Sequence, residues 1–434
     1  MVPRPASVIR LVLSSSLQTD IGNLSAFIAE DGHGASVTAE RPIIRPFVVL
    51  AMRFDGAERA GRGPIGTIGP MIDPDGLERA RALHARSIVI DTHCDTTARL
   101  GEAGWDFAKR HEDGHLDIPR LREGGVSTVF LAVFAPGPVE PGAGIAAAKR
   151  QLDLIHSLIE GLRDELASVR TADDVRAAKA AGKIGIGIGI EGGYLIEDSL
   201  DVLREYHSAG ASYLTLTHRF HTRWADSSGI MQRLPARHGG LTDFGRTVVR
   251  ELNRLGMMVD VSHVSDDTFR DVLETTAAPI IATHSSCRTV ADHPRNLSDE
   301  MIRAIAAGGG VVQINFSAMF VDPDHPPLSA EALADMLAGK DMPPGLFGSY
   351  VTPLKRLVDH FDHALELVGP EHVGIGSDFD GVQRLPEGMG DCSRLPYLTE
   401  ALLRRGWRED QLAAMLGENV LRVMEACARV ASDG

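Results

Sequence analysis

The stretch Ser87-Ile-Val-Ile-Asp-Thr-His-Cys-Asp95 is a short run of apolar, β-branched residues that ends in polar side chains able to bind a metal. Runs of this kind, separated by amphipathic stretches long enough to be helices, are typical of βαβ units in a parallel sheet. Seven further runs follow: Val126–Phe134, Ile184–Ile190, Ser212–Thr217, Met257–Val261, Pro279–Thr283, Gly310–Asn315 and His372–Gly376. Eight strands close a (β/α)8 barrel, so we predict an α/β protein with this TIM-type fold.

Polar residues that can cap a helix precede several of the amphipathic stretches. Thr242, Ser265 and Ser298 each precede a candidate helix, and side-chain oxygens at such positions accept hydrogen bonds from free amides of the first turn. The longest candidates, Ile145–Leu166 and Leu354–Val368, carry apolar residues three and four positions apart. We expect these two helices to cover the outside of the barrel.

Two segments fall outside the alternation of strands and helices. Residues 1–75 mix Pro, Gly, Ser and short apolar pieces without sustained periodicity. This pattern predicts a poorly ordered N-terminal extension ahead of a barrel domain at 76–434. The segment Phe320–Tyr350, rich in Pro, Asp and Gly, interrupts the pattern before the eighth strand and is expected to form a loop over the site.

The composition argues against several classes of protein. Hydrophobic residues make up 44% of the 434 residues and charged residues 24%, as in ordinary globular domains. The formal charge of −15 argues against nucleic acid as a partner. Because no stretch approaches the roughly 20 apolar residues that span a bilayer, we expect no membrane association. The four cysteines form no C-x-x-C pair, which fits a reducing compartment and predicts a cytoplasmic protein.

Side chains that can bind a metal recur where the predicted strands end. They are His93 and Asp95 at the first strand, Glu191 at the third, His218, His263 and His284 at the fourth, fifth and sixth, and Asp378 at the eighth. Barrel enzymes gather their chemistry at the C-terminal ends of the strands. A lone histidine at such a position is more often structural, but the recurrence at six strand ends favours a metal site.

The types of ligand indicate the metal and the number of ions. In His93-Cys94-Asp95 alternate side chains of a strand point the same way, which is the geometry of a chelate. Nitrogen and carboxylate oxygen without sulfur suit zinc, while manganese, cobalt and iron stay open. Three histidines and two carboxylates exceed the about three protein ligands of one catalytic zinc. We therefore predict two zinc ions per chain that share a bridging carboxylate.

The motifs around these strand ends resemble those of the membrane (renal) dipeptidase family of zinc peptidases, in a bacterial-type form. The resemblance spans about Arg86–Ala428 and includes Ile90-Asp-Thr-His-Cys-Asp95, Gly189-Ile-Glu-Gly-Gly193, Tyr213-Leu-Thr-Leu-Thr-His218, Val259-Asp-Val-Ser-His263, Thr283-His-Ser-Ser286, Arg295-Asn296 and Gly376-Ser-Asp-Phe-Asp-Gly381. It implies that His93 and Asp95 hold one ion, that His263 and His284 hold the other, and that Glu191 bridges them.

The resemblance also implies roles for three residues near the metals. Asp378 assists proton transfer, His218 contacts the scissile group, and Arg295 receives the free carboxylate of the substrate, a task that suits a guanidinium fork. The expected reaction is hydrolysis of a dipeptide by a metal-bridged hydroxide, with Glu191 as the catalytic bridge and with tolerance of a C-terminal D residue.

Two other classes of function stay open. A related binuclear metallohydrolase could act on N-acyl amino acids, lactams or another small amide, because barrels support many chemistries. A catalytically silent binding protein would usually have lost at least one ligand, and every predicted ligand is present. By base rate, a homodimer is the expected form of any assembly.

Four residues beside the predicted ligands are assigned no catalytic role. Tyr194 and Trp224 follow strand ends, where they either line the pocket or pack in the core. Cys94 and Cys287 are expected to be small buried residues rather than metal ligands.

Overall fold

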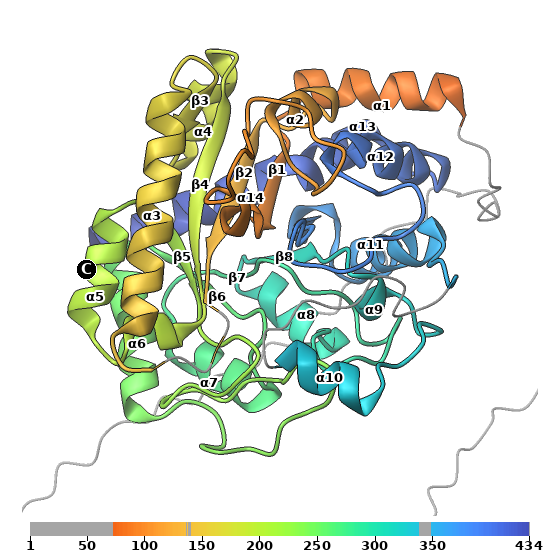
Figure 1. Cartoon of the computed structure of the whole chain (residues 1–434). Coiled ribbons are helices and arrows are strands. Elements are labelled where there is room, and N and C mark those ends of the chain that lie inside the picture. The colour runs from red at the N-terminus through yellow and green to blue at the C-terminus, as the bar shows by residue number, and fades with distance from the viewer. Residues whose placement is uncertain (1–72, 136, 138–139, 338–348, 434) are drawn as a thin grey trace, which may run out of the picture. The chain divides into compact units, whose positions relative to one another are not determined.

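The computed structural model describes residues 73–135, 137, 140–337 and 349–433. Within them, parallel strands form one closed sheet (Figure 1). Eight strands correspond to the predicted runs: β1 (Ile90–Cys94), β2 (Thr128–Val133), β4 (Ile184–Glu191), β5 (Ala211–Thr215), β6 (Met258–Asp260), β7 (Ile280–Ala282), β8 (Val311–Ile314) and β9 (Val373–Ile375). The sheet closes because β2 pairs with both β1 and β4. The predicted (β/α)8 barrel is confirmed.

A ninth strand, β3 (Leu166–Ser168), has no counterpart among the predicted runs. It pairs with the first three residues of β4, on the edge that β5 occupies further along. The predicted helix Ile145–Leu166 is therefore too long, because α3 spans Ala143–Gly161 and the chain leaves the helix at Leu162, where φ is −119°. The buried side chain of Leu166, which continues the helical spacing in the sequence, belongs to a strand.

Helices surround the barrel in the order expected for βα units. They are α1 (Pro74–Arg86), α2 (Ile118–Glu123), α3, α4 (Ala172–Ala180), α5 (Leu200–Ser208), α6 (Asp243–Leu255), α7 (Asp266–Thr275), α8 (Asp299–Ala307), α9 (Ala318–Val321), α10 (Ala330–Leu337), α11 (Leu354–Val368), α12 (Leu395–Arg404), α13 (Glu409–Ala413) and α14 (Asn419–Asp433). Shorter 3₁₀ or π segments are η1 (Thr96–Arg99), η2 (Gly193–Ile196), η3 (Pro370–His372), η4 (Cys392–Arg394) and η5 (Ala414–Glu418). Among the described helices none is long and apolar enough to span a membrane.

The predicted helix starts are confirmed. Thr242, Ser265 and Ser298 are the N-caps of α6, α7 and α8, and each side-chain oxygen accepts a hydrogen bond from the amide three residues on. The expected loop Phe320–Tyr350 contains α10, and its residues 338–348 lie outside the described part of the chain. Of the predicted N-terminal extension, residues 1–72 also lie outside the described residues, so its poor order stays a prediction.

The sequence of β4 alternates isoleucine and glycine and ends in glutamate. Its isoleucines pack in the outer core between the sheet and the helices. A Cβ on Gly187 would lie 2.4 Å from the ring of Phe130. One on Gly189 would lie 1.9 Å from the ring of Tyr213, so these two aromatic rings fill the space that glycine leaves. Glu191 continues the glycine face of the strand and therefore points into the barrel mouth.

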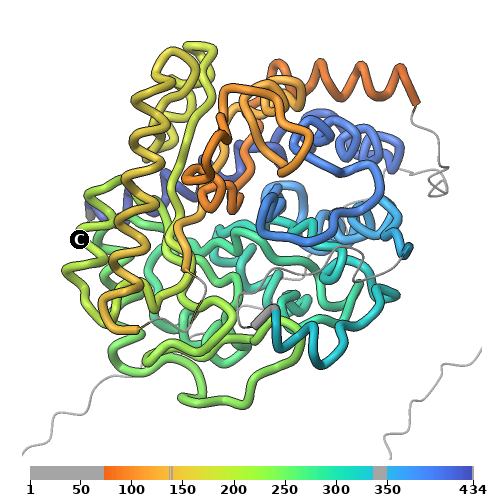
Figure 2. The backbone as a smooth tube through the Cα atoms, in the orientation of Figure 1, coloured from red at the N-terminus to blue at the C-terminus, as the bar shows by residue number. Residues whose placement is uncertain are grey.

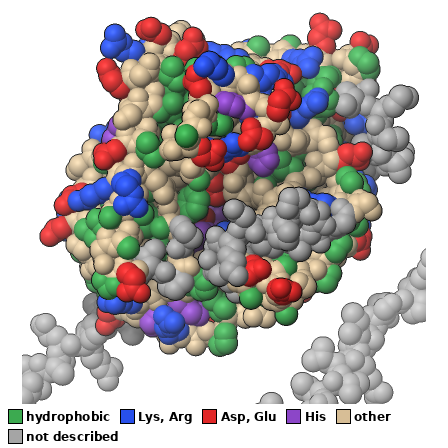
Figure 3. All heavy atoms as spheres, viewed as in Figure 1, with side chains coloured by type: hydrophobic (Ala, Val, Ile, Leu, Met, Phe, Trp, Pro, Cys, Tyr) green, Lys and Arg blue, Asp and Glu red, His purple; other side chains and the backbone are tan. Residues whose placement is uncertain are grey.

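Helix α14 packs against the N-terminal ends of the strands, and Figure 2 traces it to the C-terminal end of the chain. Its polar side chains donate hydrogen bonds to carbonyls at or just before the starts of strands: Asn419 to Val373 O, Arg422 to Gly309 O and Cys427 to Pro279 O. Its apolar residues, Val420, Leu421 and Val423, extend the core that fills the barrel. On the face seen in Figure 3, acidic and basic side chains are interspersed.

Candidate metal centre

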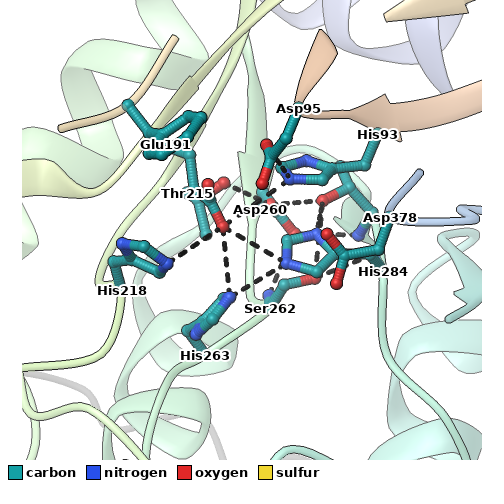
Figure 4. Close-up of polar contacts among 12 residues, drawn as sticks. His93, Asp95, Glu191, Thr215, His218, Asp260, Ser262, His263, His284 and Asp378 are labelled. Carbon is teal, nitrogen blue, oxygen red and sulfur yellow. Dashed lines mark hydrogen bonds and ion pairs between the residues drawn. The ribbon is translucent and has the colours of Figure 1, made fainter. Parts of the chain in front are cut away.

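The predicted ligands meet at the C-terminal end of the barrel (Figure 4). His93 lies on β1 and Asp95 directly after it, Glu191 ends β4, and His218, His263, His284 and Asp378 follow β5, β6, β7 and β9. All are buried except Asp378, which is partly exposed. Six strand ends that lie far apart in the sequence therefore supply one compact cluster.

Glu191 lies at the centre of this cluster. Its Oε1 is 3.2 Å from Nε2 of His263 and 3.4 Å from Nε2 of His284. The same oxygen is 3.6 Å from Nε2 of His93 and 3.6 Å from Nε2 of His218. One carboxylate thus faces four imidazole nitrogens, an arrangement in which it can be shared between neighbouring cations.

Several ligand atoms of the cluster are buried without a hydrogen-bond partner. They include His93 Nε2, Asp95 Oδ1 and Glu191 Oε2. His263 Nε2 and His284 Nε2 lie only 2.9 Å apart. Buried polar atoms are normally paired, and an unpaired one costs about 1–3 kcal/mol. Divalent cations would satisfy these nitrogen and oxygen atoms, so the residues fit a metal centre.

Three overlapping sets of residues bring their ligand atoms within 4.8 Å of one another: His93, Glu191 and His284; Glu191, His218 and His263; and His93, Asp95 and Asp378. All five predicted metal ligands occur in these sets. His218 and Asp378, which the sequence analysis assigns to the substrate and the proton, lie close enough to join them. Glu191 and His93 each belong to two of the sets, and of these two side chains the carboxylate is the one with two oxygens to share between cations.

The carboxylates carry more negative charge than the bare protein accommodates easily. Burial raises the pKa of Asp95 to about 7, and the charge of Glu191 adds to this rise. Burial also raises the pKa of Asp378. For Glu191 burial acts in the same direction, but the nearby imidazoles of His218 and His93 lower its pKa well below the ordinary value. Bound cations would offset the charge of all three carboxylates.

Three of the histidines that face Glu191 favour the neutral form: His218, His263 and His284. The pKa of His93 is instead raised well above the ordinary value, because the effects of Tyr213 and Glu191 outweigh that of burial. Burial lowers the pKa of His263 and of His284 well below the ordinary value, and the charge of Arg295 lowers both further. Burial also lowers the pKa of His218 to about 4. A neutral imidazole is the form that binds a metal, so these side chains are ready to act as ligands near neutral pH.

Asp378 is held in place by its neighbours. Its Oδ2 accepts a hydrogen bond of 2.8 Å from Asn315 Nδ2. A Cβ on Gly381 would lie 2.4 Å from Asp378 Oδ1 and 2.2 Å from Asp95 Oδ2. Since any side chain at position 381 would collide with both carboxylates, glycine there allows the two to approach each other.

Arg295 is a buried cation at the edge of the cluster, with 2% of its surface exposed. Its guanidinium donates to His284 O at 3.0 Å and to Ser285 Oγ at 3.5 Å, while Nε has no partner. Burial lowers its pKa to about 10, so it stays charged at neutral pH. Among the described residues no carboxylate forms an ion pair with it, which leaves the guanidinium able to bind an anion.

A comparison with protein families covers the whole barrel. Residues 77–433 match the model of the membrane dipeptidases, peptidase family M19. The chain belongs to this family. Dipeptidase verJ of Clonostachys rogersoniana is 35% identical over 374 residues, which cover 82% of this chain and 88% of that relative. Dipeptidase 3 of Rattus norvegicus is 34% identical over 367 residues, which cover 82% of this chain and 69% of that relative.

Solved structures agree with this assignment. The probable dipeptidase PvdM from Pseudomonas aeruginosa superposes with a TM-score of 0.72 at 26% identity, over 82% of this chain and 99% of that one. A metallo peptidase from Rhodobacter sphaeroides, liganded with a phosphinate mimic of the dipeptide L-Ala-D-Ala, gives 0.69 at 28% identity, over 79% and 99%. The predicted resemblance is confirmed, and the chain is a metal-dependent dipeptidase of the M19 family.

Residues behind the ligands of this M19 centre are absent from the sequence-based site. Asp260, fully buried, accepts hydrogen bonds from the hydroxyls of Thr215 and Thr283 and from the amides of Ser262 and Thr283. Asn315 positions Asp378. Their positions in the sequence could have indicated a place near the site, because Asp260 precedes His263 in one motif and Asn315 ends a predicted strand. The identity of their partners depends on contacts between strands that sequence spacing does not specify.

The structure also locates the side chains to which no role was assigned. Tyr194 stacks on the ring of His218 at 6.5 Å between centroids and donates to Ala135 O, so it lies beside the M19 centre. Trp224 is buried and packs against Phe244. Cys94 and Cys287 are buried free thiols, as expected, and neither belongs to a candidate metal set among the described residues.

Proposed function

We propose that the chain is a zinc-dependent dipeptidase that binds two ions. In this proposal His93 and Asp95 hold one ion, His263 and His284 hold the other, and Glu191 bridges them. The observation that carries it is the position of Glu191 Oε1, within 3.2–3.6 Å of four imidazole nitrogens. Nitrogen and oxygen ligands without sulfur suit zinc.

When bound, the cations would lower the pKa of a shared water and polarise the scissile carbonyl. The chain's own side chains carry out the proton transfer. Asp378 takes the proton of the attacking water and returns it to the departing amine, a role that its place beside His93 and Asp95 supports. His218, neutral because burial lowers its pKa to about 4, donates an N–H to the oxygen on which negative charge develops.

In this proposal Arg295 binds the free carboxylate of the residue that follows the scissile bond. A buried guanidinium without a carboxylate partner among the described residues supports this role, because Arg–carboxylate pairs give two directed, charge-assisted hydrogen bonds. A C-terminal amide, or a tripeptide bound for cleavage of its first peptide bond, would leave the guanidinium without that partner. The substrate class is therefore a peptide whose second residue carries the terminal carboxylate.

Dipeptides with a C-terminal D residue are included in the proposed substrates. The support is the Rhodobacter sphaeroides relative, whose bound ligand mimics L-Ala-D-Ala. Dipeptides with either configuration at the second residue should therefore be compared directly. The cytoplasmic location and the homodimer remain predictions.

The experiment is elemental analysis of the purified protein together with hydrolysis of matched L-L and L-D dipeptides, their C-terminal amides and tripeptides. We expect about two zinc ions per chain, cleavage of the dipeptides, and little cleavage of the amides and tripeptides. Cleavage of N-acyl amino acids or lactams in place of dipeptides would overturn the substrate class. Absence of metal, with no rescue by added zinc, would overturn the mechanism.

A further inference from the structure

Two hydroxyl groups lie directly behind the imidazoles that face Glu191. Tyr213 OH is 2.9 Å from Nδ1 of His93, and Thr283 Oγ1 is 2.9 Å from Nδ1 of His284. Both hydroxyls are fully buried. A histidine binds a metal through one nitrogen, and the hydrogen bond at the other nitrogen decides which one is free.

The direction of the bond at Tyr213 follows from its second partner. Its hydroxyl has one hydrogen and lies 3.0 Å from the carbonyl oxygen of Thr92. Because a carbonyl only accepts, the phenol donates that hydrogen to Thr92. The phenolic oxygen must then accept from His93, so His93 carries its proton on Nδ1. In the neutral ring, which is the form that binds a metal, Nε2 is then bare. This is the nitrogen that has no hydrogen-bond partner.

The same argument applies to Thr283. Its hydroxyl lies 2.6 Å from Asp260 Oδ2, and the remaining contacts of that carboxylate are also donors, so the carboxylate accepts from Thr283. The threonine oxygen then accepts from Nδ1 of His284. Nε2 of His284 is bare as a result and lies 3.4 Å from Glu191 Oε1.

We infer that Tyr213 and Thr283, with Asp260 behind the latter, are positioning residues that select the metal-binding tautomers of His93 and His284. The inference rests on the proposed function for its assignment of the two histidines to different ions. Tyr213 then controls the affinity of the ion held by His93 and Asp95. Thr283 controls the affinity of the ion held by His263 and His284.

The second ion depends on Thr283 in particular. Nδ1 of His263 has no hydrogen-bond partner within the described residues. Of the two imidazoles assigned to this ion, His284 alone therefore has its tautomer fixed by such a contact in the part of the chain that the structure describes. Without the Thr283 hydroxyl, no such hydrogen bond from the described residues fixes the tautomer of either His263 or His284.

The space for the Tyr213 ring is built into the barrel. The ring lies against Gly189 of β4, where a Cβ would approach within 1.9 Å. Any larger residue at this position would displace the ring and with it the hydroxyl. The glycine of β4 thus contributes to the alignment of His93, although it touches no ligand atom.

The test measures zinc release from the holoprotein in competition with a chromophoric chelator, for Tyr213→Phe and Thr283→Val. Each variant removes one hydroxyl and keeps the shape of the side chain. We expect each variant to lower the affinity for one of the two ions by about 10- to 100-fold, which is the usual effect of residues behind a ligand. The affinity for the other ion should not change. The two variants should affect different ions.

Matched controls separate this effect from a general loss of stability. Tyr206→Phe removes a buried phenol that donates to Leu195 O. Thr215→Val removes a hydroxyl that donates to the same oxygen of Asp260 but contacts no histidine in the described residues. Tyr206→Phe should retain both ions with wild-type affinity, and Thr215→Val should weaken zinc binding less than Thr283→Val because it leaves the contact with His284 in place. Thermal melting of each metal-free variant against its control measures the cost to the fold.

The outcomes distinguish this inference from the proposed function. Wild-type affinity for both ions in Tyr213→Phe and Thr283→Val would overturn the tautomer selection while the two-ion centre stands. A wild-type protein that binds a single ion would overturn the assignment of the two histidines to different ions. Long-range ¹H–¹⁵N spectra of histidine-labelled protein, with resonances assigned from His93→Gln and His284→Gln, must show Nδ1 protonated in both rings. The opposite tautomer would overturn the inference independently of metal content.

Discussion

Buried histidines at the two ends of the barrel differ in the hydrogen bonding of their ring nitrogens. At the N-terminal end, His84 of α1 has both ring nitrogens paired, Nδ1 with Gly124 O at 2.8 Å and Nε2 with Thr399 Oγ1 at 2.7 Å. At the C-terminal end, His263 has an unpaired Nδ1 and an Nε2 that faces Glu191. Since an unpaired buried imidazole nitrogen is costly, its presence at His263 is consistent with a ligand-binding role for that ring.

The arginines repeat this difference. Arg422 of α14 donates to the carbonyls of Gly309 and Glu371, so its charge is spread over backbone acceptors below the strands. Arg295 at the other end has an unpartnered Nε and no carboxylate pair among the described residues. In these two comparisons the side chain at the C-terminal end keeps an unpartnered nitrogen, whereas the one at the N-terminal end is paired with acceptors.

The largest effect is expected from Glu191→Gln. A neutral amide cannot offset the charge of the cations, so kcat/KM for a dipeptide should fall by about 10³-fold or more, equivalent to ~4 kcal/mol. Steady-state kinetics and zinc content measure it. Glu251→Gln is the control, because Glu251 is a buried carboxylate paired with Arg204 and Arg254 outside the site. Wild-type kinetics in Glu191→Gln would contradict the central role of this carboxylate.

Leu421→Ala, at the N-terminal end of the barrel, should lower stability and leave activity unchanged. Leu421 is fully buried in the core that fills the barrel, and large-to-small substitutions of this kind cost about 2–5 kcal/mol. We expect the free energy of unfolding in urea to fall by that amount. The folded enzyme should keep its kcat/KM, and a large change in kcat/KM below the unfolding transition would show that the two ends are not independent.

Arg295→Ala should act on substrate recognition. Hydrogen bonds to charged groups contribute about 1.5–3 kcal/mol, so kcat/KM for dipeptides should fall by about 10- to 100-fold, mainly through KM. The slow cleavage of C-terminal amides should not change, because they lack the carboxylate. Arg422→Ala removes a guanidinium from the other end and should affect stability alone. Equal losses on dipeptides and amides would argue against a carboxylate clamp.

The smallest effect is a pH dependence at His84. Burial lowers its pKa from 6.5 to about 4 in the folded chain. Below pH 6.5 the unfolded chain therefore takes up a proton that the folded chain does not, and the free energy of unfolding falls toward pH 4, by about 2 kcal/mol at pH 5. Denaturation at pH 7 and pH 5 should show a smaller pH dependence in His84→Gln. An identical dependence in both proteins would mean that His84 does not contribute.

The sequence predicts the barrel because each strand carries its own apolar signal. All eight strands and the caps at Thr242, Ser265 and Ser298 follow from local patterns. The strand β3 escapes prediction because its three residues are too short for a periodic signal. Its Leu166 also fits the spacing of the preceding helix.

The sequence predicts the candidate metal ligands but not the residues that contact them from behind. His93 and His284 are predicted because histidines at strand ends are unusual in number. Tyr213 and Thr283 are not, because a tyrosine inside a strand and a threonine at its end are ordinary residues there. Their role depends on which groups the parallel register places 3 Å apart.

The glycines of β4 have a consequence for how the barrel assembles. Glycine in the interior of a strand weakens it by about 0.5–1 kcal/mol, and β4 contains Gly185, Gly187 and Gly189. We expect β4 to gain order late in folding, after Phe130 and Tyr213 from the neighbouring strands occupy the space beside it. The pairing of β2 with β4 would then form last and close the barrel. The strand that closes it would be the one that carries Glu191.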